Sequence, residues 1–491
     1  MTTFLNNIEG KGAIMKQKIL GLCINDGDFS IAEFSKELNA SIPTVTRLIG
    51  ELIEDGFLED LGKTGTSGGR RPSIYGLNQA AGYFVGADVR RHHVSIAVTN
   101  FKGKLVDYKE DIPLVLEGTE DSLRHLTELI KKNTASLGIE QEKVLAYGIN
   151  LTGRVNHETG YSFSYFIGED KPLSQVLEKE LGAPVFIEND SRAMAYGEYI
   201  CGEANNEKNM LFINLSWGLG MGMVLDGKLS YGKSGFSGEI GHFPMLDNGK
   251  ICQCGKIGCL ETGASGSALH RIFVEKIKEG KASSISSKFE NPEDIGIDDI
   301  VEALMEEDVL AIECVEEIGS VLGQAIAGLI NIFNPELVVI GGRLAIAKDY
   351  LMLPIKSAIN RHSLIIVSKD TSIKFSKLGK KGGPVGACML SRSRLLGLNM
   401  KKICIPAVII ATLMFLPGFA FAQKLSPKEI KDGTAYYDGA ELPLFGKAFE
   451  GDCANGRYRR LTARLEGGCR GAVWHLGQES AGLYLRFRSD S

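Results

Sequence analysis

The first 78 residues show helical periodicity followed by a glycine-rich segment. Ser30, with Glu33 in the capping-box position, predicts the start of a helix over 31–38. After a short turn, Ser41 is the expected N-cap of a further helix that continues to Ile53, with apolar residues recurring on one face. Two helices joined by a short turn, ahead of a predicted two-stranded wing, are typical of a winged helix-turn-helix.

The second helix of this pair begins with polar residues, where a recognition helix meets the major groove. A Gly-Gly-Arg-Arg-Pro arm ends the wing, and paired arginines on a glycine-rich backbone suit a narrow minor groove. A helix pair alone is also compatible with an ordinary helical hairpin, but the wing and the arm favour DNA binding. The residues expected to contact DNA are Ser41, Thr44, Thr46, Arg47, Arg70 and Arg71.

From residue 83 strands alternate with helices, which predicts α/β layers. The first half has predicted strands at 84–89, 93–99, 104–107 and 144–150, and a helix at 119–137. A second strand-rich opening begins at 210–215, and its helical part runs over 300–333 before a strand at 337–340. The repeated opening implies two lobes, over about 79–200 and 201–396, with a cleft between them.

Composition limits the number of domains, the kind of DNA-binding surface and the redox compartment. The chain has 491 residues, 44% of them hydrophobic, which predicts two to four domains with ample core. Its net charge of −5 argues against a wholly basic nucleic-acid coat but allows a local DNA-binding patch. Within the first 390 residues, the cysteines outside the metal-binding motif described next are scattered, which fits a reducing cytosol. They are Cys23, Cys201, Cys314 and Cys388.

A cysteine-rich segment over 238–265 carries the strongest chemical signal. His242, Cys252, Cys254 and Cys259 form a Cys3His set, a common composition of structural zinc sites. The alternative is three unrelated buried thiols and a surface histidine, but three cysteines within eight positions favour a metal. Because all four coordination positions are filled by protein, we expect a structural Zn²⁺ and not a catalytic one.

Two carboxylates frame this segment. Glu239 lies three residues before His242, and Glu261 lies two residues after Cys259. Carboxylates fixed in this way suit a hydroxyl-rich ligand such as a sugar, which is held by rigid polar side chains. The alternative is that both are solvated loop acids.

These features together resemble the ROK family of repressors, open reading frames and sugar kinases, whose domain has the two-lobed actin/hexokinase-like (RNase H-like) fold. The resemblance spans about 12–396. It rests on the Gly-Glu-Ile-Gly-His motif with its Cys-x-Cys-x4-Cys cluster, on Glu188-Asn189-Asp190, on Asn-Pro-Glu followed by Gly341-Gly342, and on the arginine arm.

The resemblance implies roles for individual residues. The positions that match those holding sugar hydroxyls are Asn189, Asp190, Glu239, His242 and Glu261. His242 would also bind zinc. Asp190 matches the catalytic base of the kinases, which takes a proton from the sugar before phosphoryl transfer.

The chain departs from the family's kinases in both phosphate loops. The expected Asp-x-Gly-Gly-Thr is Asp-Val-Arg-Arg-His over 88–92, and the second loop has Trp217 where threonine is usual. Bulky side chains replace the glycines that let backbone N–H groups approach a phosphate. Because electrostatic positioning supplies most of the catalysis of phosphoryl transfer, we expect no kinase activity.

After residue 399 the sequence restarts. Met400, two lysines, an apolar run over 403–419 and an Ala-Phe-Ala site form the pattern of a bacterial signal peptide over 400–422. The segment 423–491 resembles the opening of the β-rich domain that precedes some secreted SGNH/GDSL-type esterases, and it has no Gly-Asp-Ser nucleophile block.

Two interpretations of this tail stay open. In one, a lost boundary joins two neighbouring genes, which the new methionine and the incomplete domain favour. In the other, 403–419 anchors the chain in the inner membrane with basic residues on the cytoplasmic side. Its length reaches only the lower edge of what spans a bilayer.

The sequence thus predicts an α/β protein with a winged helix-turn-helix over 1–78, a ROK domain over 79–396 and a truncated β-rich fragment. The expected function is sugar-responsive regulation of carbohydrate-utilisation genes by a cytoplasmic protein. Regulators of this family are most often repressors. The expected partners are an operator in double-stranded DNA, a sugar and a second copy of the chain, as a homodimer or homotetramer. The alternative function is an ATP-dependent sugar kinase.

Overall fold

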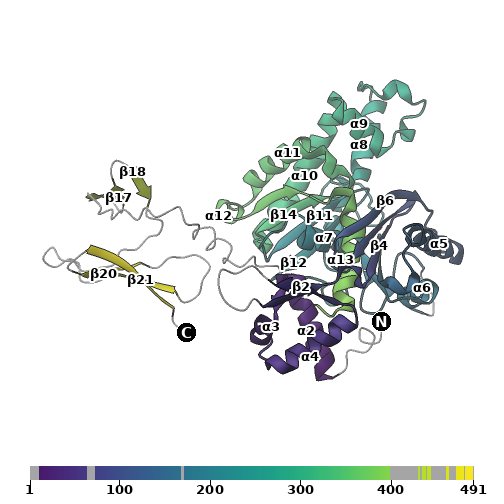
Figure 1. Ribbon diagram of the computed structural model, residues 1–491. Helices are drawn as coiled ribbons and strands as arrows, with labels where there is room; N and C mark the ends of the chain where they lie inside the picture. The colour runs from purple at the N-terminus through teal and green to yellow at the C-terminus, as the bar shows by residue number, and fades with distance from the viewer. Residues whose placement is uncertain are drawn as a thin grey trace. The chain divides into compact units, whose positions relative to one another are not determined.

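The computed structural model describes residues 10–63, 72–166 and 171–398, together with short strands between 429 and 489. Contacts divide the chain into two compact units, Met1–Ile405 and Pro406–Ser491. The first unit contains the winged helix and both predicted lobes (Figure 1). The arginine-bearing arm, with Arg70 and Arg71, and the segment 400–422 lie outside the described residues.

The N-terminal part is a winged helix-turn-helix. Its helices are α2 (Lys11–Asp26), α3 (Ile31–Glu37) and α4 (Ile42–Glu54), and its strands are β1 (Phe29–Ser30), β2 (Leu58–Lys63) and β3 (Ser73–Leu77). Ser30 and Glu33 form the predicted capping box, and the Ser41 side chain accepts from Thr44 N. The sequence predicted a two-stranded wing. The sheet has three strands in the order β1–β3–β2, because the short strand β1 also pairs with β3.

The first lobe is built on a five-stranded sheet in the order β10–β7–β4–β5–β6. Its strands are β4 (Tyr83–Val89), β5 (His93–Asn100), β6 (Leu105–Pro113), β7 (Val144–Leu151) and β10 (Val185–Asn189). Every residue of β7 is buried, as expected of a central parallel strand covered on both faces. The lobe also contains α5 (Glu120–Ser136), α6 (Leu173–Leu181) and the hairpin of β8 (Val155–Asn156) and β9 (Tyr161–Ser162).

The second lobe repeats this topology, with the strand order β13–β12–β11–β14–β15. Its strands are β11 (Met210–Leu215), β12 (Leu219–Leu225), β13 (Lys228–Leu229), β14 (Leu337–Gly341) and β15 (Ser372–Phe375). Its helices are α8 (Gly266–Lys278), α9 (Ile297–Met305), α10 (Val309–Phe333), α11 (Lys348–His362) and α12 (Ile365–Ser368). In each lobe the first strand is central, antiparallel to the second and parallel to the fourth, so the predicted duplication holds at the level of topology.

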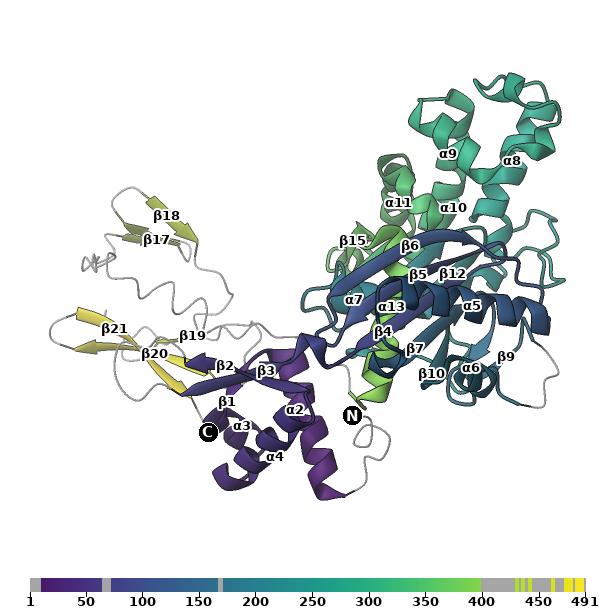
Figure 2. The same ribbon diagram turned by 45° about the vertical axis from the view of Figure 1, so that its right-hand side comes forward.

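Two helices join the lobes. The helix α7 (Asp190–Cys201) starts at the end of β10 and packs against β11 and β12 of the second lobe. The helix α13 (Gly382–Leu395) follows the second sheet in the chain but packs against β4, β5 and β7 of the first, and against α7 (Figure 2). The last part of 201–396 therefore contributes to the core of the first lobe, which a division of the chain into consecutive lobes did not anticipate.

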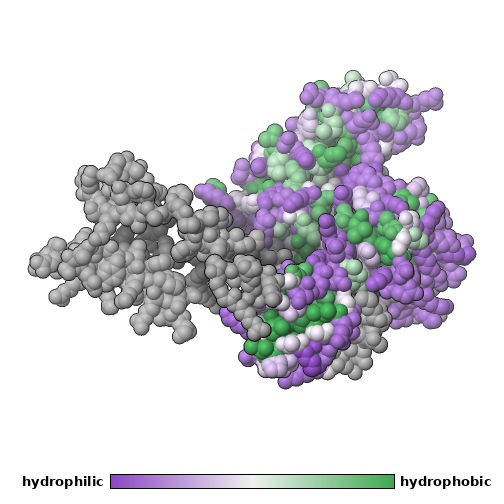
Figure 3. All heavy atoms as spheres, in the orientation of Figure 1, coloured by the Kyte–Doolittle hydropathy of each residue, from purple (hydrophilic) through white to green (hydrophobic). Residues whose placement is uncertain are grey.

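The winged helix is packed onto the first lobe. The Phe57 and Phe101 rings lie with centroids 5.5 Å apart, and one hydrophobic cluster continues from the winged helix through Phe84 to α13. Leu398, just after α13, lies against α2, where a Cβ on Gly21 would be 3.2 Å from its Cδ2. The surface over these helices carries both hydrophobic and hydrophilic patches (Figure 3).

The second unit contributes two small antiparallel sheets. The first comprises β16 (Glu429–Lys431), β17 (Thr434–Tyr437) and β18 (Ala440–Pro443). The second comprises β19 (Leu461–Ala463), β20 (Ala472–Glu479) and β21 (Gly482–Ser489). Among the described helices none is long and apolar enough to cross a membrane, and the predicted segment 403–419 lies outside the described residues.

Candidate functional site

The four predicted metal ligands converge. Their ligand atoms all lie within 4.8 Å of one another. Cys254 Sγ is 3.7 Å from Cys259 Sγ, and Cys252 Sγ is 3.6 Å from His242 Nδ1. A tetrahedral ion with metal–sulfur bonds of about 2.3 Å places its sulfurs about 3.8 Å apart. The donor set and its spacing therefore fit a tetrahedral Cys3His metal site.

Glycines shape the backbone of this loop. Gly255, with φ +84°, closes a turn in which its N–H donates to Cys252 O at 2.8 Å. At Gly258, with φ +79°, a Cβ would lie 2.3 Å from Leu246 O. Both positions have the left-handed backbone that favours glycine, and at Gly258 the close approach of Leu246 O also excludes a side chain, so the turn that gathers the thiols depends on these two positions.

His242 presents its two ring nitrogens to different neighbours. Nδ1 faces Cys252, whereas Nε2 lies 3.9 Å from Glu239 Oε2, and both side chains are about 40% exposed. A metal on Nδ1 would therefore leave Nε2 as a donor toward a bound ligand. Glu261 has a different position, because its Oε2 accepts from Leu219 N at 3.0 Å and its Oε1 lies 3.7 Å from Cys252 Sγ.

Asn189 and Asp190 begin α7. Asn189 is the N-cap, with Oδ1 accepting from Arg192 N, and its Nδ2 donates to Gly153 O and to Asp190 Oδ1 at 2.9 Å each. Asp190 Oδ1 also accepts from the Ser191 N–H at 2.7 Å. The hydrogen bonds that Asp190 accepts, from Asn189 and Ser191, all end on its Oδ1, which leaves Oδ2 to accept from a ligand hydroxyl.

The surroundings of Asp190 disfavour its charged form. Burial, and then the negative charge of Asp88, raise the pKa of the Asp190 carboxyl to about 6. At pH 7 the carboxyl of Asp190 is therefore mostly ionised, the form that accepts from a sugar hydroxyl, and a pKa so close to neutral also suits a general base.

The start of β12 connects Asp190 with the metal-binding loop. Leu219 N donates to Glu261, and Leu219 O lies 2.4 Å from the position of a Cβ on Gly241. On its other side, a Cβ on Gly220 would lie 2.2 Å from Ser191 Oγ, next to Asp190. The structure thus attaches both groups of predicted sugar-binding residues to one short segment of the second lobe.

The first phosphate loop contains an ion pair. Asp88 is fully buried at the end of β4, and its Oδ2 accepts from Arg90 Nε at 3.0 Å. The Asp88 charge raises the pKa of Arg90, which keeps this pair ionised. The guanidinium of Arg90 therefore occupies one side of the Asp88 carboxylate, at a position where the resemblance predicts a glycine in the kinases.

The second phosphate loop is attached to α8. Ser216 O and Trp217 O accept from the Gly266 and Ser267 N–H groups at 2.8 and 2.9 Å, at the beginning of that helix. Trp217 itself is 53% exposed, and its ring centroid lies 5.9 Å from that of His270. The backbone donors of Gly266 and Ser267 are therefore already used within the protein.

A buried charge cluster behind Asn189 was not anticipated. Glu188 accepts from Arg192 Nε at 2.7 Å, from Asn189 N at 2.8 Å and from Arg394 Nη2. Arg394 also donates to the Tyr231 hydroxyl at 3.1 Å, so α13 and the second lobe meet at this carboxylate. The two arginines lower the pKa of Glu188 against the opposing effect of burial. The spacing of Glu188 and Arg192 was visible in the sequence, but the contribution of Arg394 was not.

The predicted DNA-contacting residues lie at the beginning of α4. Ser41, Thr46 and Arg47 are exposed and Thr44 is half-buried, with its hydroxyl 2.8 Å from Ser41 Oγ. Arg47 forms an ion pair with Glu51 one turn later on the same helix. The other predicted contacts, Arg70 and Arg71, are outside the described residues.

The chain is similar to regulators and to kinases. It is 29% identical over 385 residues to the xylose repressor of Caldicellulosiruptor bescii, covering 78% of this chain and 96% of that protein. It is 32% identical over 316 residues to a glucokinase of Halalkalibacterium halodurans, covering 64% and 96%. A solved ROK-family transcriptional regulator, described as a homologue of the E. coli MLC protein, superposes with a TM-score of 0.66 at 30% identity, covering 78% of this chain and 98% of that one.

Two family models match separate parts of the chain. Residues 434–491 match the N-terminal segment of SGNH-hydrolase-type esterases, which confirms the esterase resemblance predicted for 423–491. The signal peptide at 400–422 stays a prediction. Residues 84–394 match the ROK family, and this match covers more than half of the sequence. The chain therefore belongs to the ROK family.

Proposed function

We propose that this protein is a sugar-responsive transcriptional regulator, of the repressor type, that controls carbohydrate-utilisation genes. The observation that carries the proposal is the combination of two features in one compact unit. A winged helix-turn-helix is packed onto a ROK fold, and the Asp88 carboxylate of that fold is paired with Arg90. The first feature supports DNA binding, and the second argues against use of ATP.

Sugar binding is supported by the polar groups around the start of β12. We propose that Asn189, Asp190, Glu239, His242 and Glu261 hold the effector sugar in the cleft. Asp190 Oδ2 and His242 Nε2 are an acceptor and a donor for adjacent hydroxyls, as recognition of a pyranose requires. Asn189 and Glu261, which already bond within the protein, would mainly fix the geometry of these two groups.

We assign the metal as a structural Zn²⁺ held by His242, Cys252, Cys254 and Cys259. Three thiolates and one imidazole are the ligands that zinc prefers in closed tetrahedral sites. Bound zinc would fix the imidazole of His242 with Nε2 directed to the sugar. The ion thereby stabilises the loop and takes no part in chemistry.

The packing suggests how sugar binding reaches the DNA-binding part. The backbone N–H of Asn189 donates to Glu188, and Glu188 is paired with Arg394 near the end of α13. Three residues after that helix ends, Leu398 contacts Gly21 of α2. A change at Asn189 on closure of the lobes would move α13 and therefore α2. A sugar can drive this change only through a higher affinity for one of the two states.

A dimer follows from the proposed mode of DNA binding. Winged helix-turn-helix regulators read two half-sites about one or more helical turns apart, which takes two copies of the recognition helix. We therefore propose a homodimer or homotetramer bound to operator DNA in the cytoplasm. The alternative is that the apolar segment 403–419 anchors the protein in the inner membrane.

An ATP-dependent sugar kinase is the second candidate. The raised pKa of Asp190, about 6, favours it, because a general base works best with a pKa near the operating pH. Against it stand the Asp88–Arg90 pair and the exposed Trp217 in the two phosphate loops. Electrostatic stabilisation by such loops carries most of phosphoryl transfer.

An assay of ADP release distinguishes the two candidates. The purified chain is mixed with ATP, Mg²⁺ and each of a panel of hexoses and pentoses, with an Asp190→Asn variant as the background control. We expect no release above that control. Turnover that Asp190→Asn abolishes would establish the kinase instead.

A further inference from the structure

A tyrosine of the second lobe reaches the buried charge cluster of the first. Tyr231 follows β13, and its hydroxyl accepts from Arg394 Nη2 at 3.1 Å. Arg394 also donates to Ile187 O at 3.1 Å and to the Glu188 carboxylate, which both belong to β10 of the first lobe. The Tyr231 hydroxyl therefore connects the second lobe to the last turn of α13.

The ring of Tyr231 is held by side chains from the first lobe and from α7. His157, in the turn between β8 and β9, is stacked on it, with ring centroids 3.7 Å apart and planes inclined by 21°. The guanidinium carbon of Arg192 lies 5.9 Å from the Tyr231 centroid, within the range of a cation–π interaction. The buried Nδ1 of His157 has no hydrogen-bond partner among the described residues, so the ring face makes the contact.

Tyr231 also begins a closed loop that leads to the proposed sugar site. Ser237 N donates to Tyr231 O at 3.1 Å, and the Ser237 hydroxyl donates to Ser230 O at 2.7 Å. Glu239, one of the proposed sugar-binding residues, follows Ser237 by two positions. Because these two bonds restrain the loop as one piece, a shift of Glu239 is expected to reach Tyr231.

Tyr231 packs against the hydrophobic cluster that continues to the winged helix. That cluster includes Leu395 of α13, Phe101 in the turn after β5, and Phe57 of the winged helix. The chain after α13 continues to Leu398, which lies against α2. Close-packed interiors transmit strain, so a displacement of Tyr231 would act on side chains that extend to the DNA-binding helices.

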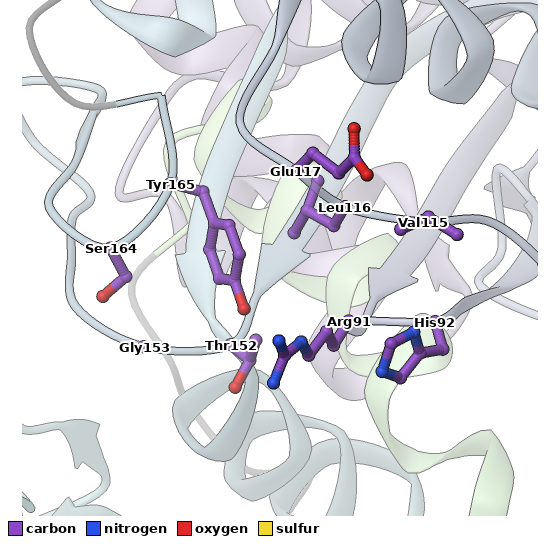
Figure 4. A pocket seen from close by; sticks show the side chains of 9 residues that line it. All are labelled: Arg91, His92, Val115, Leu116, Glu117, Thr152, Gly153, Ser164 and Tyr165. Atoms are coloured by element: carbon purple, nitrogen blue, oxygen red, sulfur yellow. The ribbon is translucent and has the colours of Figure 1, made fainter. Parts of the chain in front are cut away.

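This junction is separate from the cavity in the first lobe. The cavity, of about 590 Å³, is lined by the β4–β5 turn and by the segments that follow β6, β7 and β9 (Figure 4). Tyr231 and His157 are not among its lining residues. The effect inferred for Tyr231 therefore does not depend on a ligand in that cavity.

We propose that Tyr231 is a positioning residue that couples sugar binding in the second lobe to α13 through its bond to Arg394. This proposal rests on the function proposed above. It gives the second lobe a route of its own to the winged helix, beside the route through Asn189 and Glu188. A sugar held by Glu239 would move the loop, and the Tyr231 hydroxyl would carry that movement to Arg394 without touching the sugar.

The test measures sugar affinity, operator affinity and the coupling between them in the full chain. Calorimetry with a panel of hexoses and pentoses that includes xylose and glucose selects the tightest-binding sugar. Anisotropy titration of an operator obtained by in vitro selection then gives the effect of that sugar. We expect Tyr231→Phe to bind sugar and operator separately within about threefold of the wild type, because the ring and the other bonds of Arg394 stay. The sugar should change its operator affinity less than about twofold, against about fivefold or more in the wild type.

Three further variants control for the loss of a hydroxyl and test the stack. Tyr147→Phe removes a hydroxyl that accepts from Gln141 Nε2 at 3.3 Å within the first lobe, and it should retain the full sugar response. His157→Ala should weaken the response, because it removes the ring that holds Tyr231. His157→Phe keeps an aromatic ring at this position and should restore the response.

The outcomes separate this proposal from the proposed function. A wild-type sugar response in Tyr231→Phe would refute the role of Tyr231 and leave the sugar-responsive regulator in place. Loss of sugar binding in Tyr231→Phe would assign Tyr231 to the sugar site itself and would also refute the proposal. A wild type whose operator affinity ignores every sugar of the panel would overturn both.

Discussion

At the scale of single residues, the chemistry of the site depends on a few charged groups held by many hydrogen bonds. Glu188 is 1% exposed and receives donors from two arginines and from the backbone of Asn189. Burial of a lone carboxylate would cost several kcal/mol, and the arginines offset this cost only while both are present. The cluster therefore supports the backbone that presents Asn189 and Asp190 to a ligand.

Removal of one arginine should expose this dependence. We expect Arg394→Met to lower the free energy of unfolding by about 2–4 kcal/mol, because the Glu188 charge stays buried with one partner fewer. Arg124→Ala, at an exposed ion pair with Asp121, should change it by less than about 0.5 kcal/mol. Denaturant unfolding followed by circular dichroism measures both, and an equal effect of the two variants would contradict the assigned role of Arg394.

Asp190 gives a prediction about pH. Its carboxyl has a pKa of about 6 in the native protein, above its ordinary value of 3.8, so the native state retains a proton that the unfolded chain has lost. This contribution to stability is present below pH 4 and is lost as the pH rises through 6.

The uncharged variant Asp190→Asn should not show this loss. From pH 4 to pH 7, the unfolding free energy of Asp190→Asn should rise by about 1–2 kcal/mol relative to that of the wild type. This figure is lower than the full pKa shift would give, because solvent partly screens the carboxylate. Melting temperatures of both proteins at several pH values measure this gain. Parallel curves across that range would show that the pKa of Asp190 is not raised.

At the scale of structural elements, the loop over 242–261 has few buried apolar side chains, so the proposed metal would supply much of its stability. Cys252, Cys259 and Leu260 are buried there, whereas Phe243, Ile251 and Ile257 are exposed. A loop with so little apolar burial would gain its stability from a coordinated ion, as the proposed zinc site predicts.

Loss of one thiolate should therefore separate sugar binding from DNA binding. We expect Cys259→Ser to reduce zinc from about one ion per chain to near zero and to weaken sugar binding at least tenfold. DNA binding should persist, since the winged helix packs in a different hydrophobic cluster from the one that contains Leu260 of the metal-binding loop. Metal analysis and calorimetry provide the measurements, with Cys201→Ser, at an exposed cysteine outside the cluster, as the control. Full zinc content in Cys259→Ser would exclude this ligand set.

The helix α4 carries a separate prediction. Replacement of Arg47 by alanine should weaken operator binding by about 1–3 kcal/mol, or roughly tenfold or more, and reduce its dependence on salt. The protein should keep its fold, because Arg47 is exposed and, within the described part of the chain, its ion-pair partner is Glu51 of its own helix. Fluorescence anisotropy at two salt concentrations measures this change, and unaltered affinity would remove α4 from the DNA interface.

Helix caps and ligand spacings could be predicted from the sequence, whereas contacts between distant elements could not. The capping box at Ser30, the N-cap at Ser41 and the ligand spacing from His242 to Cys259 are local patterns, and the structure has all three. The strand β1 has only two residues, which is too short for a periodicity. The bond from Arg394 to Glu188 joins residues 206 positions apart, and the return of α13 to the first sheet is set by packing of the complete fold.

At the scale of the whole molecule, the duplicated lobes and the winged helix form one unit in which α13 has a central place. This helix packs on the first sheet, bonds to Glu188 and leads to Leu398 at α2. The arrangement links the proposed sugar site to the proposed DNA-binding helices without any chemical step. A protein of this kind reports the presence of a sugar by changing its affinity for DNA.

The most direct test is an anisotropy titration of an operator obtained by in vitro selection, with and without the sugar that calorimetry identifies. We expect the sugar to change the operator affinity of the wild type at least fivefold, in line with typical coupling energies of about 1–3 kcal/mol. We expect Glu239→Ala to bind the operator as tightly as wild type and to show no response to sugar. A variant that still responds as wild type does, or a wild type whose operator affinity ignores every sugar that it binds, would contradict the account.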